Sequence, residues 1–287
     1  MKKIFLSVTF FCLTVFGAGT SSFISIDLPH GARVIGMGES FTGYDRDTYS
    51  QLWNPAGVYG GLSFSASHTM LFEDIKNDFI ILTFPTNIGY WGMSLSYIDF
   101  GTFNGLDGHA RNPYEFTANE LIFSIVYGRW VQEHLKFGVG INYGSSRLEN
   151  ENSSVWSINS GLIYTMNRNT KLGLSIKNIG GKLTYIRTPY PLPIALSLGI
   201  SKKTRNLLYT GEVSLRNDDK PQIGFGLEYK ITFLSFRTGF RTQDDLGILS
   251  LFRFGFGVEK DWIKFDYAFI PSGDFGLRQY FTLSISR

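Results

Sequence analysis

The residue types that usually carry catalysis or bind metal ions are sparse in this chain and lie far apart. The only cysteine is Cys12, and no serine lies in a motif that would present it as a nucleophile. The histidines are too scattered for the paired spacing of a metal site: His30, His68, His109 and His134. The sequence therefore predicts neither a metal nor a cofactor.

Two weaker arrangements could still carry chemistry. His109 lies near Asp107 in a long predicted loop, and a His/Asp pair could serve hydrolysis. Asp45 and Asp47 flank an arginine, and two carboxylates can act as a general acid and a general base. Salt links to neighbouring arginines are the favoured interpretation of the two aspartates. We therefore predict that the protein is not an enzyme.

The bulk composition excludes several classes of protein. Of the 287 residues, 18% are charged, against about 25% in soluble domains. A net charge of +3 is too small and too dispersed to predict a nucleic-acid partner. Beyond the N-terminus no apolar run approaches the ~20 residues that a membrane-spanning helix needs. Neither a nucleic-acid-binding protein nor a helical membrane protein is expected.

In the segments that must position the polar residues, apolar and polar or small residues alternate with a period of two. From Leu135 to Tyr143 every odd-numbered residue is apolar, and Lys, Gly or Asn stands between them. Successive side chains of a strand point to opposite faces, so this pattern gives one apolar and one polar face. Unpaired backbone groups are costly in lipid, and closing a sheet removes its edges. The alternation therefore predicts an all-β fold, a transmembrane antiparallel β-barrel.

Fourteen segments carry this signal. They centre on residues 62–69, 78–85, 89–98, 117–129, 134–145, 154–165, 170–178, 193–202, 206–216, 221–230, 233–242, 248–259, 262–270 and 278–287. Long and short connections alternate, as 99–116 and 130–133 illustrate. Outer-membrane barrels have short periplasmic turns, longer external loops and an even number of strands. The sequence therefore predicts about 14 strands.

The charges of these strands are expected to face the lumen. Phe236 and Phe240 alternate with Arg237 and Arg241, so the phenylalanines are predicted to face lipid and the arginines the interior. A charged side chain at the lipid midplane would cost about 2–4 kcal/mol. The inner wall is therefore predicted to carry charges.

The first residues are typical of a secretory signal peptide. Lys2 and Lys3 precede an apolar stretch that ends in small residues, which predicts a signal peptide over 1–19. Its removal would leave a mature chain without cysteine. We expect the mature protein in the outer membrane of a bacterial cell, in contact with its lipid.

Residues 20–60 lack the strict alternation. They are rich in Gly, and a short helix is predicted around 48–52, with Pro55 ending it. A compact, irregular segment ahead of a barrel indicates a hatch, or plug, in the lumen. The predicted organisation is this hatch followed by a barrel over 61–287.

Two segments resemble PorV/PorQ-type outer-membrane proteins, which belong to the wider FadL superfamily of transporters for hydrophobic compounds. The first contains Gly31-Ala32-Arg33, Gly36-Met37-Gly38 and Trp53-Asn54-Pro55-Ala56-Gly57, and the second is Phe265-Asp266-Tyr267-Ala268-Phe269-Ile270-Pro271. The resemblance implies a fourteen-stranded barrel with an N-terminal hatch.

The resemblance also implies a gate in the hatch, formed by Asn54, Pro55, Ala56, Gly36 and Gly38. In FadL-type transporters the hatch carries an Asn-Pro-Ala element, and its movement is thought to open a path for a hydrophobic ligand, which leaves sideways through the wall. Alternatively, these residues only turn the chain, because Asn is a good cap and Pro fixes φ.

Some strands are apolar on both faces. A lumen wall that contains Ile80, Leu82, Phe84 and Ile122 would be apolar. Either the hatch packs against this wall, which is the favoured interpretation, or apolar cargo passes along it.

The sequence thus predicts a FadL-like channel for passive uptake of hydrophobic or small molecules. The alternative is a PorV-like carrier or scaffold in type IX protein secretion, whose partners would be secretion-system proteins. Modest loops argue mildly against that role, because a protein partner needs a larger exposed surface.

Overall fold

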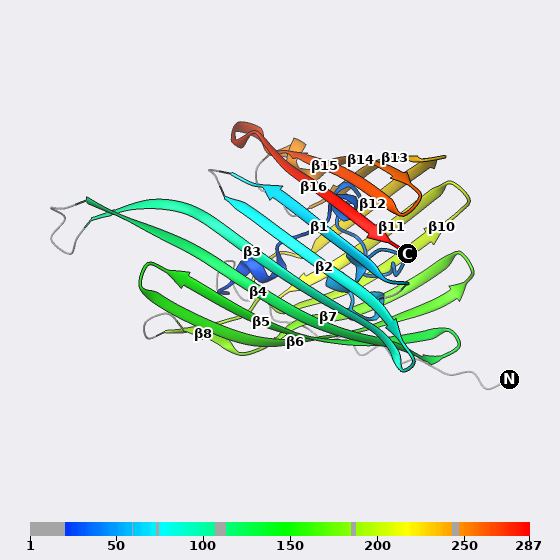
Figure 1. The fold of residues 1–287 in the computed structure, drawn as a ribbon, viewed down its shortest axis with the longest axis horizontal. Coiled ribbons are helices and arrows are strands. Elements are labelled where there is room, and N and C mark those ends of the chain that lie inside the picture. Colours follow the sequence, from blue (N-terminus) through cyan, green and yellow to red (C-terminus); the bar gives the residue numbers. More distant parts are fainter. Residues whose placement is uncertain (1–20, 59, 73–74, 107–112, 185–187, 243–246) are drawn as a thin grey trace.

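Fourteen antiparallel strands form a closed barrel, which confirms the predicted fold class. The structure is a computed structural model that describes residues 21–58, 60–72, 75–106, 113–184, 188–242 and 247–287. The predicted signal peptide (1–19), Cys12, Asp107 and His109 lie outside the described residues. The first strand pairs with the last, so the sheet has no open edge (Figure 1).

The barrel strands agree with the predicted segments to within a few residues at most ends. They are β1 Ser63–Met70, β2 Lys76–Thr86, β3 Gly89–Leu106, β4 Pro113–Gln132, β5 Leu135–Leu148, β6 Glu151–Asn167, β7 Thr170–Gly180, β10 Ala195–Lys203, β11 Leu207–Arg216, β12 Gln222–Ile231, β13 Leu234–Arg241, β14 Phe252–Lys260, β15 Ile263–Pro271 and β16 Leu277–Ser286. Two short strands, β8 Lys182–Thr184 and β9 Pro189–Pro191, form a separate sheet that was not predicted.

The helices are short. They are η1 Ile24–Asp27, α1 Ala32–Gly36, α2 Ser50–Trp53, η2 Pro55–Gly57, η3 Ile248–Leu251 and η4 Gly273–Phe275. None of the described helices is long and apolar enough to cross a membrane. The short helix predicted ahead of Pro55 is present as α2, whereas η3 replaces the predicted start of the twelfth strand.

The two ends of the barrel differ in their connections. At one end, here called the short-turn end, the links are turns such as 87–88 and 133–134. At the other, the long-loop end, the links include 181–194, which contains β8 and β9. The predicted loop 99–116 is wrong over most of its length, because β3 and β4 continue through it as a paired hairpin.

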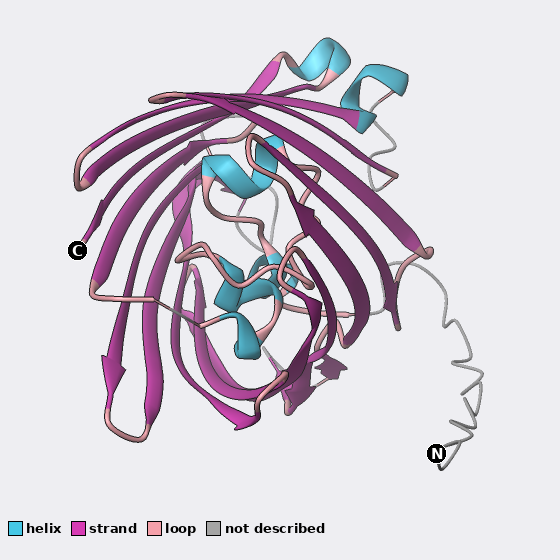
Figure 2. Cartoon of the chain, turned by 90° about the vertical axis from the view of Figure 1, so that its right-hand side faces the viewer, coloured by secondary structure: helices cyan, strands magenta, loops and turns pink. Residues whose placement is uncertain are grey.

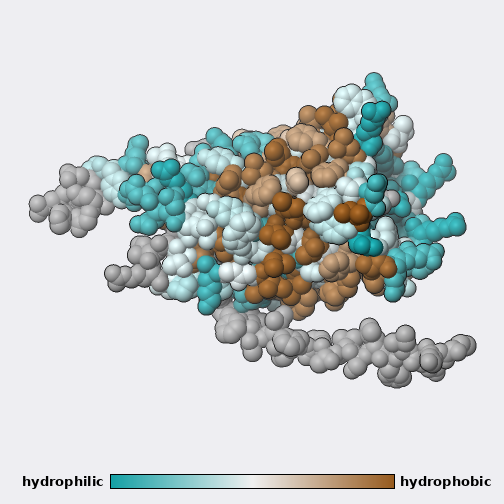
Figure 3. Space-filling view, turned by 60° about the horizontal axis from the view of Figure 1, so that its bottom comes forward, coloured by the Kyte–Doolittle hydropathy of each residue, from teal (hydrophilic) through white to brown (hydrophobic). Residues whose placement is uncertain are grey.

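The outer face of the barrel is apolar and the inner face is polar, as the alternation predicts. Phe225 and Phe236 are exposed on the outside, whereas Arg237 and Arg241 are buried inside. The space-filling view shows the resulting apolar band between two hydrophilic ends (Figure 3). This surface suits lipid around its middle and water at both ends.

Residues 21–58, here called the N-terminal segment, lie inside the barrel (Figure 2). Helix α1 packs against β13–β16, and η2 packs against β4, β5 and β6. Near residue 23 the segment lies at the long-loop end, and near residue 46 it reaches the short-turn end. The core of the molecule is therefore the contact between this segment and the inner wall.

Candidate functional site

The candidate site is the space between the N-terminal segment and the inner wall, and Asn54 marks a tightly packed point of it. Asn54 is fully buried. Its side-chain amide donates hydrogen bonds to the carbonyl oxygens of Thr42 and Leu162, both at 2.9 Å. Its side-chain oxygen accepts a bond from the Ala56 nitrogen at 3.0 Å and so caps η2, which begins at Pro55. The Asn-Pro-Ala element is thus bound both to itself and to β6.

Glycine allows the segment to approach the wall this closely. A Cβ atom at Gly161 of β6 would overlap the side chain of Asn54. In the segment itself, Gly38 has a φ of 65° and lies against the backbone of β12, where a side chain would be both strained and obstructed. Gly36 ends α1 and is buried against β14. The predicted gate residues therefore lie in two separate contacts with opposite sides of the wall.

Ion pairs hold the part of the segment that contains α1. The Arg33 guanidinium lies 2.6 Å from a carboxylate oxygen of Glu228 and 2.9 Å from one of Asp47. The Glu39 carboxylate lies 3.0 Å from the Arg253 guanidinium of β14. These groups are nearly all buried, where an unpaired charge would be costly. The arrangement fixes α1 electrostatically to β12 and β14.

The two aspartates considered as an acid/base pair are salt-link residues. Asp47 pairs with Arg33, and the buried Asp45 pairs with Lys171 of β7. Within the described residues, no group of three or more His, Cys, Asp and Glu side chains could hold a metal ion.

An apolar cup lies inside the long-loop end, and Phe23 fills it. Phe23 is only 5% exposed and adopts a left-handed backbone conformation, with φ 55° and ψ 46°. The side chains around it come from β3, β4, β6, β8 and the segment after β9: Ile98, Ile122, Val155, Leu183 and Leu192. A non-glycine residue in this conformation carries backbone strain. The cup is thus an apolar site occupied by the chain's own side chain.

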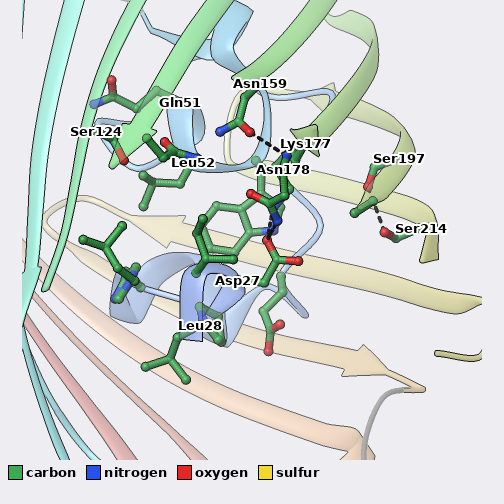
Figure 4. A pocket seen from close by; sticks show the side chains of 18 of the residues that line it. Asp27, Leu28, Gln51, Leu52, Ser124, Asn159, Lys177, Asn178, Ser197 and Ser214 are labelled. Carbon is green, nitrogen blue, oxygen red and sulfur yellow. Dashed lines mark hydrogen bonds and ion pairs between the residues drawn. The ribbon is translucent and has the colours of Figure 1, made fainter. Parts of the chain in front are cut away.

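A cavity of about 80 Å³ continues from the cup into the lumen (Figure 4). On one side it is bordered by Asp27, which lies 3.1 Å from the Lys177 amine and accepts a hydrogen bond from the Asn178 amide at 2.8 Å. Asn159 accepts a bond from the Asn178 backbone nitrogen at 2.8 Å. Leu52 comes from the N-terminal segment and contributes an apolar surface. Polar and apolar groups therefore share this cavity.

Burial and nearby charges shift the pKa values of two groups beside the cavity. Burial alone raises the pKa of Asp27, but the charges of Lys177 and Arg216 lower it by more, so the pKa lies below its usual range. Burial lowers the pKa of His30 to about 3. His30 is therefore neutral at pH 7, and its ring stacks on Phe79 with centroids 4.0 Å apart.

The predicted apolar lumen path is wrong for three of its four residues. Ile80 is 44% exposed on the outer face, and by alternation Leu82 and Phe84 point the same way. The inward side chains of β2 are Phe79 and Ile81, which pack against the N-terminal segment. Because both faces of this strand are apolar, its sequence does not show which residues face the lumen and which face outward.

The fourth residue of the path, Ile122, does face the interior. It belongs to the cup around Phe23 and also lines the cavity. The interior apolar wall is therefore covered by the N-terminal segment, as the favoured interpretation expects.

Sequence reasoning missed the cup and the polar side of the cavity. Phe23 lies just after the predicted signal peptide, where a lone aromatic residue carries no periodic signal. Lys177 and Asn178 lie within β7, at a break in its register with β6, and Asn178 has a φ of 61°. Strict alternation would turn one of these two consecutive polar residues toward lipid, so the pair was the available signal of a break in the alternation.

Comparison with known proteins supports the fold. The sequence matches no protein-family model, and no curated protein matches it. Among solved structures, the Pseudomonas putida toluene transporter TodX has a TM-score of 0.66 at 13% identity, over 90% of this chain and 98% of TodX. The CymD monoaromatic hydrocarbon channel has a TM-score of 0.58 at 12% identity, over 90% of this chain and 99% of CymD. A Pseudomonas aeruginosa FadL homologue has a TM-score of 0.55 at 11% identity, over 89% of this chain and 97% of the homologue.

These similarities establish the fold that the chain shares with hydrocarbon channels and a FadL homologue. The FadL-type part of the predicted resemblance agrees with them. The finer PorV/PorQ-type assignment has no support from these comparisons. At such low identity the neighbours do not define the cargo of this chain.

Proposed function

We propose that this protein is a FadL-like outer-membrane channel for the passive uptake of hydrophobic small molecules. In this proposal residues 1–19 are a signal peptide, 20–60 form a hatch, and 61–287 form the transmembrane barrel. The fold that it shares with the TodX and CymD channels supports the assignment. The apolar outer band supports a membrane location.

The observation that carries the proposal is an apolar route into the lumen. It begins at the cup around Phe23 and continues along Ile26 and Leu28, which pack against the cup and also line the cavity. At the cavity it reaches Leu52 and Trp53. A hydrophobic molecule that displaced the strained Phe23 would keep an apolar contact at each step.

Passage beyond the cavity requires a movement next to Trp53, where the chain continues into Asn54, Pro55 and Ala56. These residues close the space against β5 and β6. We propose that they form the gate. Residues 60–62, ahead of β1, line a pocket with residues 261–262 of a turn at the short-turn end, so release of this stretch would open the lumen toward that end.

A reversible crosslink tests this gate. The side-chain oxygens of Thr48 and Ser63 lie 2.7 Å apart and join the segment to β1. In the double variant Thr48→Cys/Ser63→Cys, a disulfide would hold both ends of the stretch that contains Asn54. We expect uptake of labelled toluene by energy-depleted cells that display the barrel to fall at least tenfold, and to recover with a reductant.

The matched control joins two wall strands and leaves the segment free. Ser65 of β1 and Ser284 of β16 are hydrogen-bonded at 2.8 Å, so Ser65→Cys/Ser284→Cys places a disulfide close by within the wall. Uptake should persist in this control under oxidising conditions. If neither variant takes up toluene even when reduced, or if the barrel co-purifies empty with a secreted protein, the transport proposal fails and a carrier role is favoured.

A further inference from the structure

The lumen cavity has no formal net charge. Apart from His30, its ionisable lining consists of three acids and three bases: Asp27, Glu39, Glu212, Lys177, Arg216 and Arg241. Each acid lies within 4 Å of a base. Asp27 lies 3.1 Å from Lys177 and 3.3 Å from Arg216. Arg241 lies 3.5 Å from Glu39 and 3.8 Å from Glu212. His30 is neutral at pH 7, because burial lowers its pKa to about 3. A charged ligand would therefore find no unmatched counter-charge in this lining.

The cavity is nevertheless rich in hydrogen-bonding groups. Ser94 of β3, Ser124 of β4 and Asn159 of β6 all line it. No described residue forms a side-chain hydrogen bond with either serine, and the amide nitrogen of Asn159 donates to none. Each of these residues keeps 7–8% of its surface accessible. These polar groups are satisfied only by something inside the cavity.

Apolar side chains also line the cavity, and two of them, Ile122 and Val126, flank Ser124 on the inner face of β4. Leu28 and Leu52 belong to the N-terminal segment, and Phe79, Ile122 and Val126 belong to the wall. An apolar surface favours the body of a hydrophobic molecule. The cavity therefore offers apolar surface and neutral hydrogen-bond donors and acceptors side by side.

We propose that the cavity binds uncharged molecules that combine an apolar body with one hydrogen-bonding group, such as an alcohol or a phenol. This inference rests on the proposed function and narrows its cargo. A pure hydrocarbon would leave the hydroxyls of Ser94 and Ser124 and the amide of Asn159 without partners. Each unsatisfied buried group weakens binding on the order of tenfold.

The size of the cavity sharpens the proposal. A dry cavity of about 150 Å³ admits benzene, whereas this one measures about 80 Å³. A ring-sized molecule therefore needs more room than the cavity offers with Phe23 in its cup. The phenyl group of Phe23 occupies the adjoining apolar space and is the side chain that such a ligand would replace. Its ring would enter the cup and its polar group would reach the cavity.

Two probes of nearly equal size separate polarity from hydrophobicity. Benzyl alcohol and toluene share a ring and differ by one hydroxyl group. We would measure their dissociation constants for the purified, folded barrel in detergent by saturation-transfer NMR. We expect benzyl alcohol to bind at least tenfold more tightly than toluene. In the variant Ser94→Ala/Ser124→Ala/Asn159→Leu this preference should disappear or reverse.

The matched control removes two wall hydroxyls that lie outside the cavity. Ser65→Ala/Ser284→Ala should leave both dissociation constants unchanged. The single variant Ser124→Ala serves if the triple variant does not fold, with a several-fold loss for benzyl alcohol alone. Equal binding of both probes to all variants would overturn this inference. Toluene uptake by cells is measured in a separate experiment. Failure of the proposed transport function can therefore be told apart from failure of the proposed ligand preference.

Discussion

Two stretches of the N-terminal segment are held to the wall by different forces. Residues 32–47, here the anchor region, carry Arg33, Glu39 and Asp45, each of which pairs with a charge on a barrel strand. Residues 48–58, here the wedge region, contain no Asp, Glu, Lys, Arg or His. Their polar contacts with the wall are hydrogen bonds, chiefly those of Asn54, together with one that the buried Lys136 amine of β5 donates to the Val58 carbonyl.

The difference suggests how one segment could close a channel and still open it. Separating a buried ion pair leaves two uncompensated charges and is strongly unfavourable. Breaking a neutral hydrogen bond costs about 1 kcal/mol when water replaces the partner. Among the described residues, the wedge region contains three buried polar atoms without a hydrogen-bond partner, on Tyr49, Ser50 and Gln51, and the longer anchor region contains two, on Thr42 and Asp45. In the proposed gate, the wedge is the contact that opens, and the anchor region keeps the segment in place.

The largest expected effect comes from breaking the anchor. Arg33→Ala would remove the closest partner of the buried Asp47, which keeps Lys264 at 3.9 Å, and one of the two arginines that lie 2.6 Å from Glu228. We expect the free energy of unfolding in urea to fall by about 3–5 kcal/mol, the range for a buried pair that loses one member.

Arg46 provides the control for this substitution. It is exposed and makes no ion pair with any described residue, so Arg46→Ala should change the free energy of unfolding by less than about 0.5 kcal/mol. Equal losses in the two variants would mean that the anchor ion pairs contribute nothing specific.

Acid should reduce the stability contributed by the N-terminal segment outside the wedge region, because the wedge region carries no group that titrates below neutral pH. The pKa of His30 is about 3 in the folded protein and about 6.5 when exposed. The unfolded state therefore takes up the proton first. The stability that neutral His30 supports is complete above pH 6.5 and is lost as the pH falls from 6.5 towards 3, by about 3 kcal/mol at pH 4.5.

A variant without the imidazole isolates this contribution from that of the carboxylates. Asp27 and Glu39 have lowered pKa values, since burial raises them but nearby cations lower them more. Their stability contribution is also lost on acidification. His30→Phe keeps an aromatic ring against Phe79, and its urea unfolding should depend less steeply on pH between 6.5 and 4.5. Identical slopes for both proteins would refute the role of His30.

The sequence predicts the barrel well because alternate residues of each strand face lipid, which gives the sequence a period of two. In β13 the outward residues are mostly apolar and the inward arginines contact polar groups, so Phe236 and Arg237 were assigned to the correct faces. That rule fails in β2, where Phe79 and Ile81 face an apolar part of the N-terminal segment. Ile80 and its outward neighbours were therefore assigned to the wrong face.

The candidate site was only partly predictable for a different reason. The motif around Asn54 is contiguous and could be found by resemblance. The cavity joins Asp27, Asn159 and Lys177, which lie on distant parts of the chain. They become neighbours only through the closure of the barrel and the path of the N-terminal segment inside it. Neither is encoded in a local pattern of residues.

The smallest expected effect on stability distinguishes a gate from a permanent closure. Asn54→Ala removes the hydrogen bonds to the carbonyl oxygens of Thr42 and Leu162, and we expect a loss of about 1–3 kcal/mol in the free energy of unfolding. Asn206→Ala removes an amide-to-carbonyl bond at an exposed turn and should cost less than about 0.5 kcal/mol. If the wedge is the gate, toluene uptake rises several-fold in Asn54→Ala alone, because its closed packing is weakened while the anchor is intact. A barrel that loses stability but keeps its uptake rate would show that Asn54 only turns the chain, and the contrast between anchor and wedge would then concern folding rather than transport.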